Sequence, residues 1–105
     1  MHGTSEEEKA MIEPGYESLA HVLQLALDQA QSGKGKERHA NSLPFHEQPI
    51  MYETRLCGLG FPIGQARKKA QETLRLPTPD AMQREILGAI NYLAAAYIYI
   101  SEAKK

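Results

Sequence analysis

The chain has 105 residues, in which 12 lysines and arginines stand against 13 aspartates and glutamates, and its isoelectric point is near 6.4. This length predicts a single domain, residues 1–105, and the lack of a basic excess argues against a general nucleic-acid-binding protein. Cys57 is the single cysteine, so no disulfide framework can form within the chain, which is consistent with the reducing cytoplasm.

The N-terminal segment, residues 1–14, is acidic and lacks the basic start and apolar run of a signal peptide. Ser5 and Glu8 have the spacing of a capping box. The segment is therefore expected to form either a short helix to about Ile12 or a frayed tail, and Pro14-Gly15 should end it.

An amphipathic helix is predicted from Tyr16 to Gln31, and Ser32-Gly33 should end it with a glycine cap. The apolar residues that share one face of this helix are Tyr16, Leu19, Leu23, Ala26, Leu27 and Ala30. His21 lies among them and is interpreted as a core or interface histidine.

Two shorter helices are predicted in the middle of the chain. The first should run from Pro49, a residue suited to a first helical turn, to Cys57. The second should run from Pro62 to about Leu74, after a flexible joint at Gly58-Leu59-Gly60. The residues expected to face inward are Ile50, Tyr52 and Leu56 in the first helix, and Ile63, Ala66, Ala70 and Leu74 in the second.

The last helix is predicted from Pro79 to Ala103, with Thr78 as its N-cap. It carries two apolar stripes: Ile86, Ile90, Leu93, Tyr97 and Ile100 form one, and Gly88, Tyr92, Ala95 and Tyr99 form the other. A helix that is apolar nearly all round must be covered nearly all round. The sequence therefore predicts an all-α fold of three to five helices, with this helix at the centre of a homo-oligomer.

A membrane span is not expected here. The apolar run Ile86–Ile100 has 15 residues, fewer than the roughly 18–20 needed to cross a bilayer, and it contains Asn91 and three tyrosines. We therefore expect this helix to be buried in protein.

A basic loop, residues 33–43, holds the strongest candidate binding site. Its cationic residues are Lys34, Lys36, Arg38 and His39, and its two glycines would let backbone N–H groups approach an anion. Phe45 follows and could provide an aromatic wall for a base or a ribose. This set suits a nucleotide, although it lacks the spacing of a Walker A loop. The alternative is a solvated loop with no ligand.

Other candidate sites have weaker patterns. The turn Gly58–Gly64 leads into a helix N-terminus that could bind an anion, but a hinge is the favoured interpretation. His39, His46 and Cys57 lack paired metal-ligand spacing. No nucleophile, base and orienting group occur together, so we expect neither an enzyme nor a cofactor or metal.

In outline, the chain resembles the small oligomeric "sponge" proteins of bacteriophages, which capture nucleotide immune signals. The resemblance is carried by the acidic start, the helical arms, the GKGKERH loop with Lys34, Lys36, Arg38 and His39, and the self-associating last helix. It implies binding without turnover, pockets near subunit contacts and action in the host cytoplasm.

Two alternatives stay open. One is a protein–protein inhibitor or adaptor of a host defence protein, which would use the stripe with Tyr92 and Tyr99 or the acidic residues Glu6–Glu8. The other is a small nucleotide pyrophosphohydrolase. Glu13 and Glu17 form one E-x-x-x-E pair, but no second acidic pair follows to complete the magnesium site of that class.

Overall fold

The computed structural model describes residues 11–32 and 43–104. These residues form the helices α2 (Glu17–Ser32), α3 (Pro49–Cys57), α4 (Gly60–Thr73) and α5 (Pro79–Ala103), with a short 3-10 helix, η2 (Phe45–Glu47). No strand occurs in the two described ranges. The all-α prediction, with a long apolar C-terminal helix, is confirmed.

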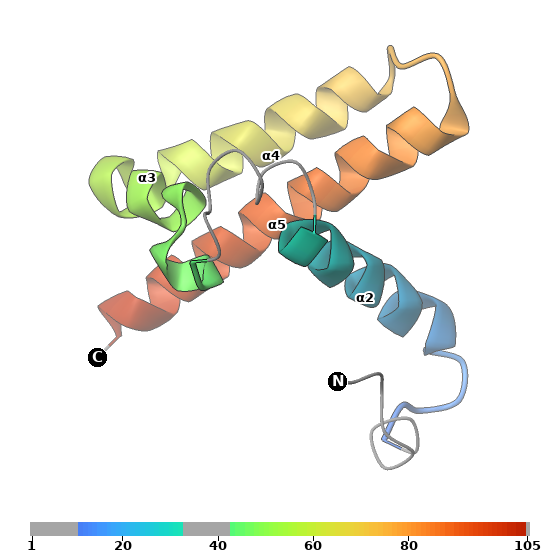
Figure 1. The fold of residues 1–105 in the computed structure, drawn as a ribbon, viewed down its shortest axis with the longest axis horizontal. Coiled ribbons are helices and arrows are strands. Elements are labelled where there is room, and N and C mark those ends of the chain that lie inside the picture. Colours follow the sequence, from blue (N-terminus) through green and yellow to red (C-terminus); the bar gives the residue numbers. More distant parts are fainter. Residues whose placement is uncertain (1–10, 33–42, 105) are drawn as a thin grey trace.

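Helices α4 and α5 lie side by side as an antiparallel hairpin (Figure 1). The start of α5 is fixed by Thr78, whose Oγ1 accepts a hydrogen bond of 3.1 Å from the backbone N–H of Ala81. Pro79 occupies the first turn, where its missing N–H costs nothing, and Asp80 meets the positive end of the helix dipole. The predicted bounds and cap of this helix are therefore confirmed.

One of the two apolar stripes of α5 faces α4. Gly88 lies against the aliphatic part of Lys69, since a Cβ added to Gly88 would stand 3.1 Å from Lys69 Cδ. The ring of Tyr92 meets Phe61 edge-on, with 5.8 Å between ring centroids, and Ala95 is completely buried. Lys69 also pairs with Glu85 at 3.7 Å. Small residues thus let the two helices approach closely.

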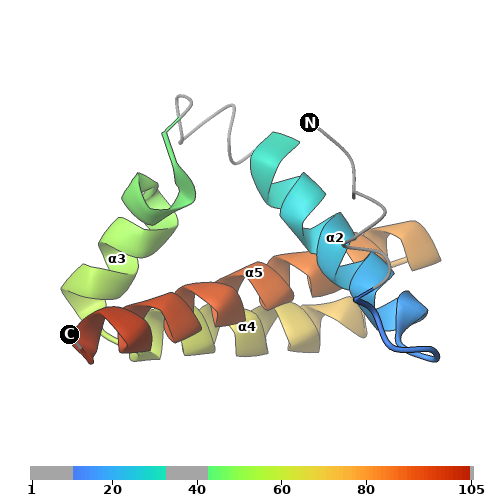
Figure 2. The ribbon, with the colours of Figure 1, turned by 90° about the horizontal axis from the view of Figure 1, so that it is seen from below.

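Helices α2 and α3 lie on the same side of this hairpin and lean toward each other as they rise from it (Figure 2). The side-chain amide of Asn91 in α5 donates a hydrogen bond of 3.0 Å to the carbonyl of Ala26, which fixes α2 across α5. Arg55 in α3 makes two hydrogen bonds to the carboxylate of Glu102 in α5, at 2.9 and 2.7 Å. The hydrogen bond to Glu102 raises the pKa of Arg55.

The predicted inward face of α3 is wrong, although its bounds are confirmed. Met51 and Thr54 are fully buried, whereas Tyr52 and Leu56 are more than 60% exposed. The helix has nine residues and contacts the rest of the described chain mainly through η2, α4 and α5. The side that meets those helices carries Met51 and a threonine, whose Oγ1 donates to the carbonyl of Ile50.

The predicted inward face of α4 is wrong in most positions. Ala66 is buried as expected, but Ile63, Ala70 and Leu74 are exposed, and Pro62 and Thr73 are buried in their place. The helix also begins at Gly60, two residues before Pro62. The α4 residues that contact α5 include Phe61, which meets Tyr92, and Lys69, which pairs with Glu85.

Helix α2 is confirmed to within one residue at each end, yet its apolar face is mostly open. Ala26 is buried, while Leu19, Leu23 and Leu27 are about half exposed. His21 is exposed as well. The capping box of Ser5 and Glu8 and the cap at Gly33 lie outside the described residues.

In the described chain, α5 is the one helix with the length and composition of a membrane span: 25 residues, with a mean hydropathy of 1.2 over its most apolar window. Core helices of proteins that never enter a membrane meet the same criterion. Only 17% of that window is buried in the described structure, so most of it is exposed or partly exposed.

Candidate functional site

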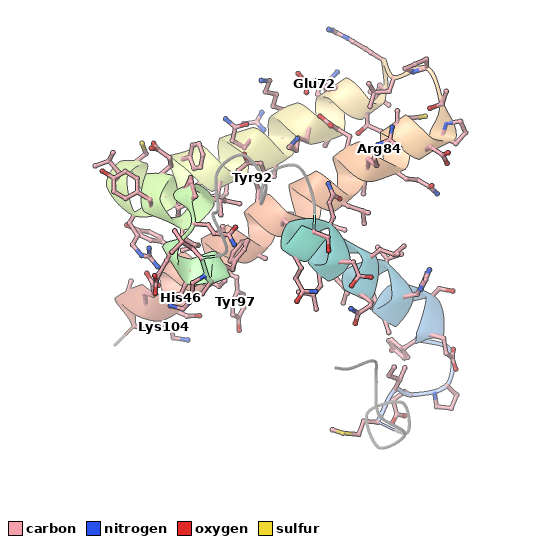
Figure 3. The ribbon with its side chains drawn as sticks, in the orientation of Figure 1. His46, Glu72, Arg84, Tyr92, Tyr97 and Lys104 are labelled. Atoms are coloured by element: carbon pink, nitrogen blue, oxygen red, sulfur yellow. The ribbon has the colours of Figure 1, made fainter. Side chains whose placement is uncertain are left out.

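Four of the five predicted ligand-binding residues, Lys34, Lys36, Arg38 and His39, lie outside the described residues. The fifth, Phe45, begins η2. The residues around Phe45 are held by Gln48, whose side-chain Nε2 donates a hydrogen bond of 2.8 Å to the carbonyl of Leu43. Figure 3 shows the side chains of this region, including His46 and Tyr97.

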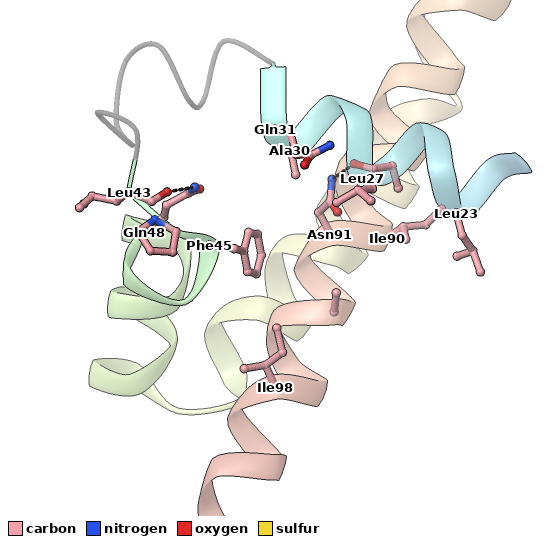
Figure 4. Close-up of a pocket in the computed structure, with 13 residues that line it drawn as sticks. Leu23, Leu27, Ala30, Gln31, Leu43, Phe45, Gln48, Ile90, Asn91 and Ile98 are labelled. Carbon is pink, nitrogen blue, oxygen red and sulfur yellow. Dashed lines mark hydrogen bonds between the residues drawn. The ribbon is translucent and has the colours of Figure 1, made fainter. Parts of the chain in front are cut away.

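Phe45 lines a groove between α2, η2 and α5, with a volume of about 620 Å³. This volume lies within the range of small-molecule sites in proteins. Figure 4 shows Phe45 on one side, Leu23 and Leu27 from α2 on another, and Ile90 and Ile98 from α5 along the floor. The remaining lining residues are Ala26, Ala30, Gln31, Leu43, Pro44, Gln48, Asn91 and Ala94.

Amide side chains supply the polar groups of the groove. Asn91 and Gln48 each use their N–H₂ group in the hydrogen bonds to Ala26 and Leu43. Each retains an amide oxygen that can accept a hydrogen bond from a ligand, and Gln31 offers both a donor and an acceptor. The groove therefore suits a flat, largely apolar group with an N–H or N–H₂ edge.

The basic loop is attached to this groove at both of its ends. Gln31, near the end of α2, and Leu43, before η2, both line the groove. Every predicted cationic residue is within five positions of Gln31 or Leu43, a distance of at most about 17 Å in extended chain. The sequence alone did not reveal this relationship, because it depends on how α2 crosses α5.

The turn Gly58–Gly64 has few free donors for an anion. The N–H of Phe61 donates to the carbonyl of Gly58 and the N–H of Ile63 donates to that of Leu59, both at 3.1 Å. Pro62 has no N–H to offer. These contacts favour the hinge interpretation of the turn.

Metal and acid–base candidates gain no support in the described residues. No group of three or more histidine, cysteine, aspartate or glutamate side chains is placed to hold a metal ion there. His46 lies 3.4 Å from the carboxylate of its neighbour Glu47, and Cys57 is exposed. His39, the third residue of the predicted set, is outside the described ranges.

The sequence interpretation missed most of the groove. Leu23 and Ile90 were assigned only to apolar helix faces, while Ile98 and Asn91 were noted only as part of the apolar run Ile86–Ile100. Asn91 was the residue in the sequence that pointed to the groove. A polar amide in an otherwise apolar stretch needs a hydrogen-bond partner when it is buried.

Comparison of the chain with family models, curated proteins and solved structures found no match.

Proposed function

We propose that this protein binds a nucleotide or a cyclic nucleotide without converting it, and that it does so as a homo-oligomer that sequesters the molecule. The observation that carries the proposal is the position of Phe45: it lines an apolar groove that is also lined by Leu43, the last residue of the basic loop, and by Gln31, two residues before the loop begins.

The two halves of a nucleotide match the two parts of this site. A base would stack on Phe45 and meet the amide oxygens of Gln48 or Asn91, and stacking on an aromatic side chain contributes about 1–3 kcal/mol per base. The phosphates would meet the loop, where Lys34 and Lys36 supply point charges. Arg38 can make two parallel hydrogen bonds to one phosphate group, and His39 adds a donor.

Sequestration follows from the resemblance to the phage sponge proteins, which bind their signals without turnover. A homo-oligomer would bring two copies of the loop together, so that the paired phosphates of a cyclic dinucleotide meet a symmetric set of cations. This action would take place in the host cytoplasm.

The test is titration calorimetry of the protein against mono-, di- and cyclic nucleotides. We expect Arg38→Ala to weaken binding more than Lys34→Ala, because a charged hydrogen bond contributes about 1.5–3 kcal/mol. Phe45→Ala should weaken binding by about tenfold or more.

Two matched variants serve as controls. Lys68→Ala removes an exposed cation of α4, and Tyr52→Ala removes an exposed aromatic ring of α3 outside the groove. Both should bind as the wild type does. If the wild type binds none of the nucleotides, or if Phe45→Ala and Arg38→Ala both bind normally, the proposal fails.

A second candidate function is an inhibitor or adaptor that binds a host defence protein. The apolar character of the groove favours it, because recognition helices of partner proteins bind in grooves of this chemistry. Wild-type protein that binds no nucleotide, yet binds a helical peptide in a Phe45-dependent way, would favour this function. The pyrophosphohydrolase alternative requires product formation from nucleotides with magnesium.

A further inference from the structure

The two walls of the groove are attached to α5 by different contacts. Leu23 and Leu27 belong to α2, which the hydrogen bond from Asn91 to the carbonyl of Ala26 holds against α5. Phe45 belongs to η2 and lines another side of the groove (Figure 4). The contacts that hold η2 relative to α5 therefore decide how far apart the two walls stand.

The short helix that carries Phe45 is continuous with α3. Gln48 is both the C-cap of η2 and the N-cap of α3. Its N–H donates a hydrogen bond of 3.0 Å to the carbonyl of Phe45, and its carbonyl accepts hydrogen bonds of 2.9 and 3.0 Å from the N–H groups of Met51 and Tyr52. Because these bonds join the two helices through one residue, η2 moves with α3 as a single body.

Helix α3 is tied to α5 at the end farthest from Phe45. It ends at Gly58, where φ is +81° and the chain turns into α4. Three residues before Gly58, Arg55 donates two hydrogen bonds, of 2.9 and 2.7 Å, to the carboxylate of Glu102. In Figure 2 this end of α3 lies beside the C-terminal end of α5. Among the described residues, this is the one ion pair that joins α3 to another helix.

Helix dipoles favour this pair. Glu102 lies in the last turn of α5, where a carboxylate meets the negative end of the dipole, and the guanidinium of Arg55 compensates for that repulsion. The paired hydrogen bonds also fix the orientation of the two groups. The two side chains are 38% and 37% exposed, so dissolved salt can weaken their attraction without unfolding the chain.

We propose that Arg55 and Glu102 are positioning residues of the groove: their ion pair holds α3 against the end of α5 and thereby sets the distance of Phe45 from α2. The nine residues of α3 span about 13 Å, so a rotation of about 10° at Gly58 moves the η2 end by roughly 2 Å. A gap of about 1 Å already removes up to about half of the attraction between two atoms in contact. Release of the pair therefore loosens the contact of Phe45 with a ring in the groove.

This inference rests on the proposed function for the identity of the ligand, but the position of Phe45 can be measured without one. If the wild type binds no nucleotide and the position of Phe45 still depends on the ion pair, the proposed function fails and the positioning role stands. If nucleotides bind and the position of Phe45 is independent of the pair, the positioning role fails alone.

The experiment is acrylamide quenching of a single tryptophan. The chain contains none, so Phe45→Trp places one reporter in the wall of the groove. In this background Arg55→Gln should increase quenching, because loss of an exposed ion pair lowers the ratio of docked to released α3 by up to about fivefold. Arg55→Glu should increase it further, since two carboxylates then face each other, and adding Glu102→Arg should restore it. Lys68→Gln removes an exposed ion pair of α4 and is the matched control.

Salt supplies a readout that a purely structural role of Arg55 would not change. Between about 0.01 and 1 M salt, the screening length falls from roughly 30 to 3 Å. Quenching should therefore rise with salt in Phe45→Trp and stay level once Arg55→Gln is added. In the chain with native Phe45, Arg55→Gln should raise the Kd for nucleotides by no more than the same factor of about five, because only the docked form is competent to bind.

Circular dichroism of each variant reports whether the helices are retained. If Phe45→Trp loses them, Leu43→Trp becomes the reporter, because Leu43 also lines the groove and is 42% exposed. If Arg55→Gln loses them, the salt titration of the reporter protein decides the outcome. The proposal is overturned if quenching is independent of both Arg55→Gln and salt, if Glu102→Arg does not restore the Arg55→Glu protein, or if Lys68→Gln increases quenching as much as Arg55→Gln does.

Discussion

The side-chain amide of Asn91 in α5 donates a hydrogen bond to the backbone carbonyl of Ala26, 65 positions earlier in the chain. This contact joins α2 to the hairpin at the inner end of the groove. We expect Asn91→Asp to reduce the free energy of unfolding by about 1–3 kcal/mol, because a carboxylate would then face a carbonyl oxygen. Asn91→Ala, which removes the donor without adding charge, should cost less. Urea unfolding at neutral pH measures the stability of both variants. If Asn91→Asp is as stable as the wild type, the hydrogen bond from Asn91 to Ala26 does not stabilise the fold.

Gly58 and Gly60 should respond differently to alanine. Gly58 has φ +81° and ψ −171°, a conformation that is costly for any residue with a side chain, by about 1–3 kcal/mol. Gly60 has no positive φ, begins α4, and has no atom within 4 Å of an added Cβ.

We therefore expect Gly58→Ala to lower the melting temperature by several degrees, at about 4–8 °C per kcal/mol for a domain of this size. Gly60→Ala should leave it unchanged or raise it slightly, since alanine reduces the entropy of the unfolded chain. Thermal unfolding without any ligand is the measurement. If the melting temperature falls by a similar amount in both variants, the positive φ of Gly58 is not the reason for the loss of stability.

Tyr92 should make stability fall at alkaline pH. Its partial burial raises the pKa of the phenol above its ordinary value of 10.0. Because the folded pKa is the higher one, this contribution is fully present below the unfolded pKa and is lost as the pH rises through the folded pKa.

Tyr92→Phe keeps the edge-on contact with Phe61 and removes the ionisable group. We expect the loss of stability between about pH 8 and about pH 11 to be smaller in this variant than in the wild type. Tyr52→Phe is the control, since Tyr52 in α3 is 61% exposed. If stability depends on pH in the same way in the wild type and in Tyr92→Phe, ionisation of Tyr92 does not cause the loss of stability at alkaline pH.

Gln29 carries a buried oxygen, Oε1, that has no hydrogen-bond partner in the described structure. Its Nε2 makes only a long bond of 3.4 Å to the carbonyl of Arg84. Replacing a buried, unsatisfied polar group by an apolar one of similar shape is neutral or stabilising. We expect Gln29→Met to raise the free energy of unfolding by up to about 1 kcal/mol, as measured by urea unfolding. A clear loss of stability would mean that the amide is satisfied in solution.

The sequence predicted where the helices are far better than which way they face. Pro49, Thr78 and Pro79 mark helix starts through local chemistry, and the bounds of α3 and α5 follow from them. Local signals of this kind do not depend on the rest of the fold.

Which side of a helix is buried depends on the helices that pack against it, and each helix of the described chain packs against few others. Large apolar residues such as Leu56 and Leu74 were expected inside, yet both are exposed. The contact between α4 and α5 instead includes Gly88, which lies against Lys69, and Tyr92, whose ring meets that of Phe61. Binary patterning assumes that the bulkiest apolar residues are covered by the same chain, and that assumption fails here because several of them are exposed.

The groove could not be predicted for a related reason. It arises where α2 crosses α5 at one point and η2 approaches from the other side. Phe45 was predicted as a wall from its distance to the basic loop, and it does line the groove. The residues opposite it come from distant positions, Leu27 and Leu23 being 18 and 22 positions before Phe45 and Ile90 being 45 positions after it, so only the tertiary arrangement brings them together.

The α4–α5 hairpin also has a consequence for the order of folding. Its ion pair joins Lys69 to Glu85, positions 16 apart, whereas the hydrogen bond that holds α2 joins positions 65 apart. Short loops close at a lower entropic cost, so the hairpin should form first and α2 should dock last. Amide hydrogen exchange should then show α2 opening in a separate, less costly step than α4 and α5. If the proposed ligand binds in the groove that α2 and α5 line, its binding should therefore slow exchange in α2 more than in α4 and α5.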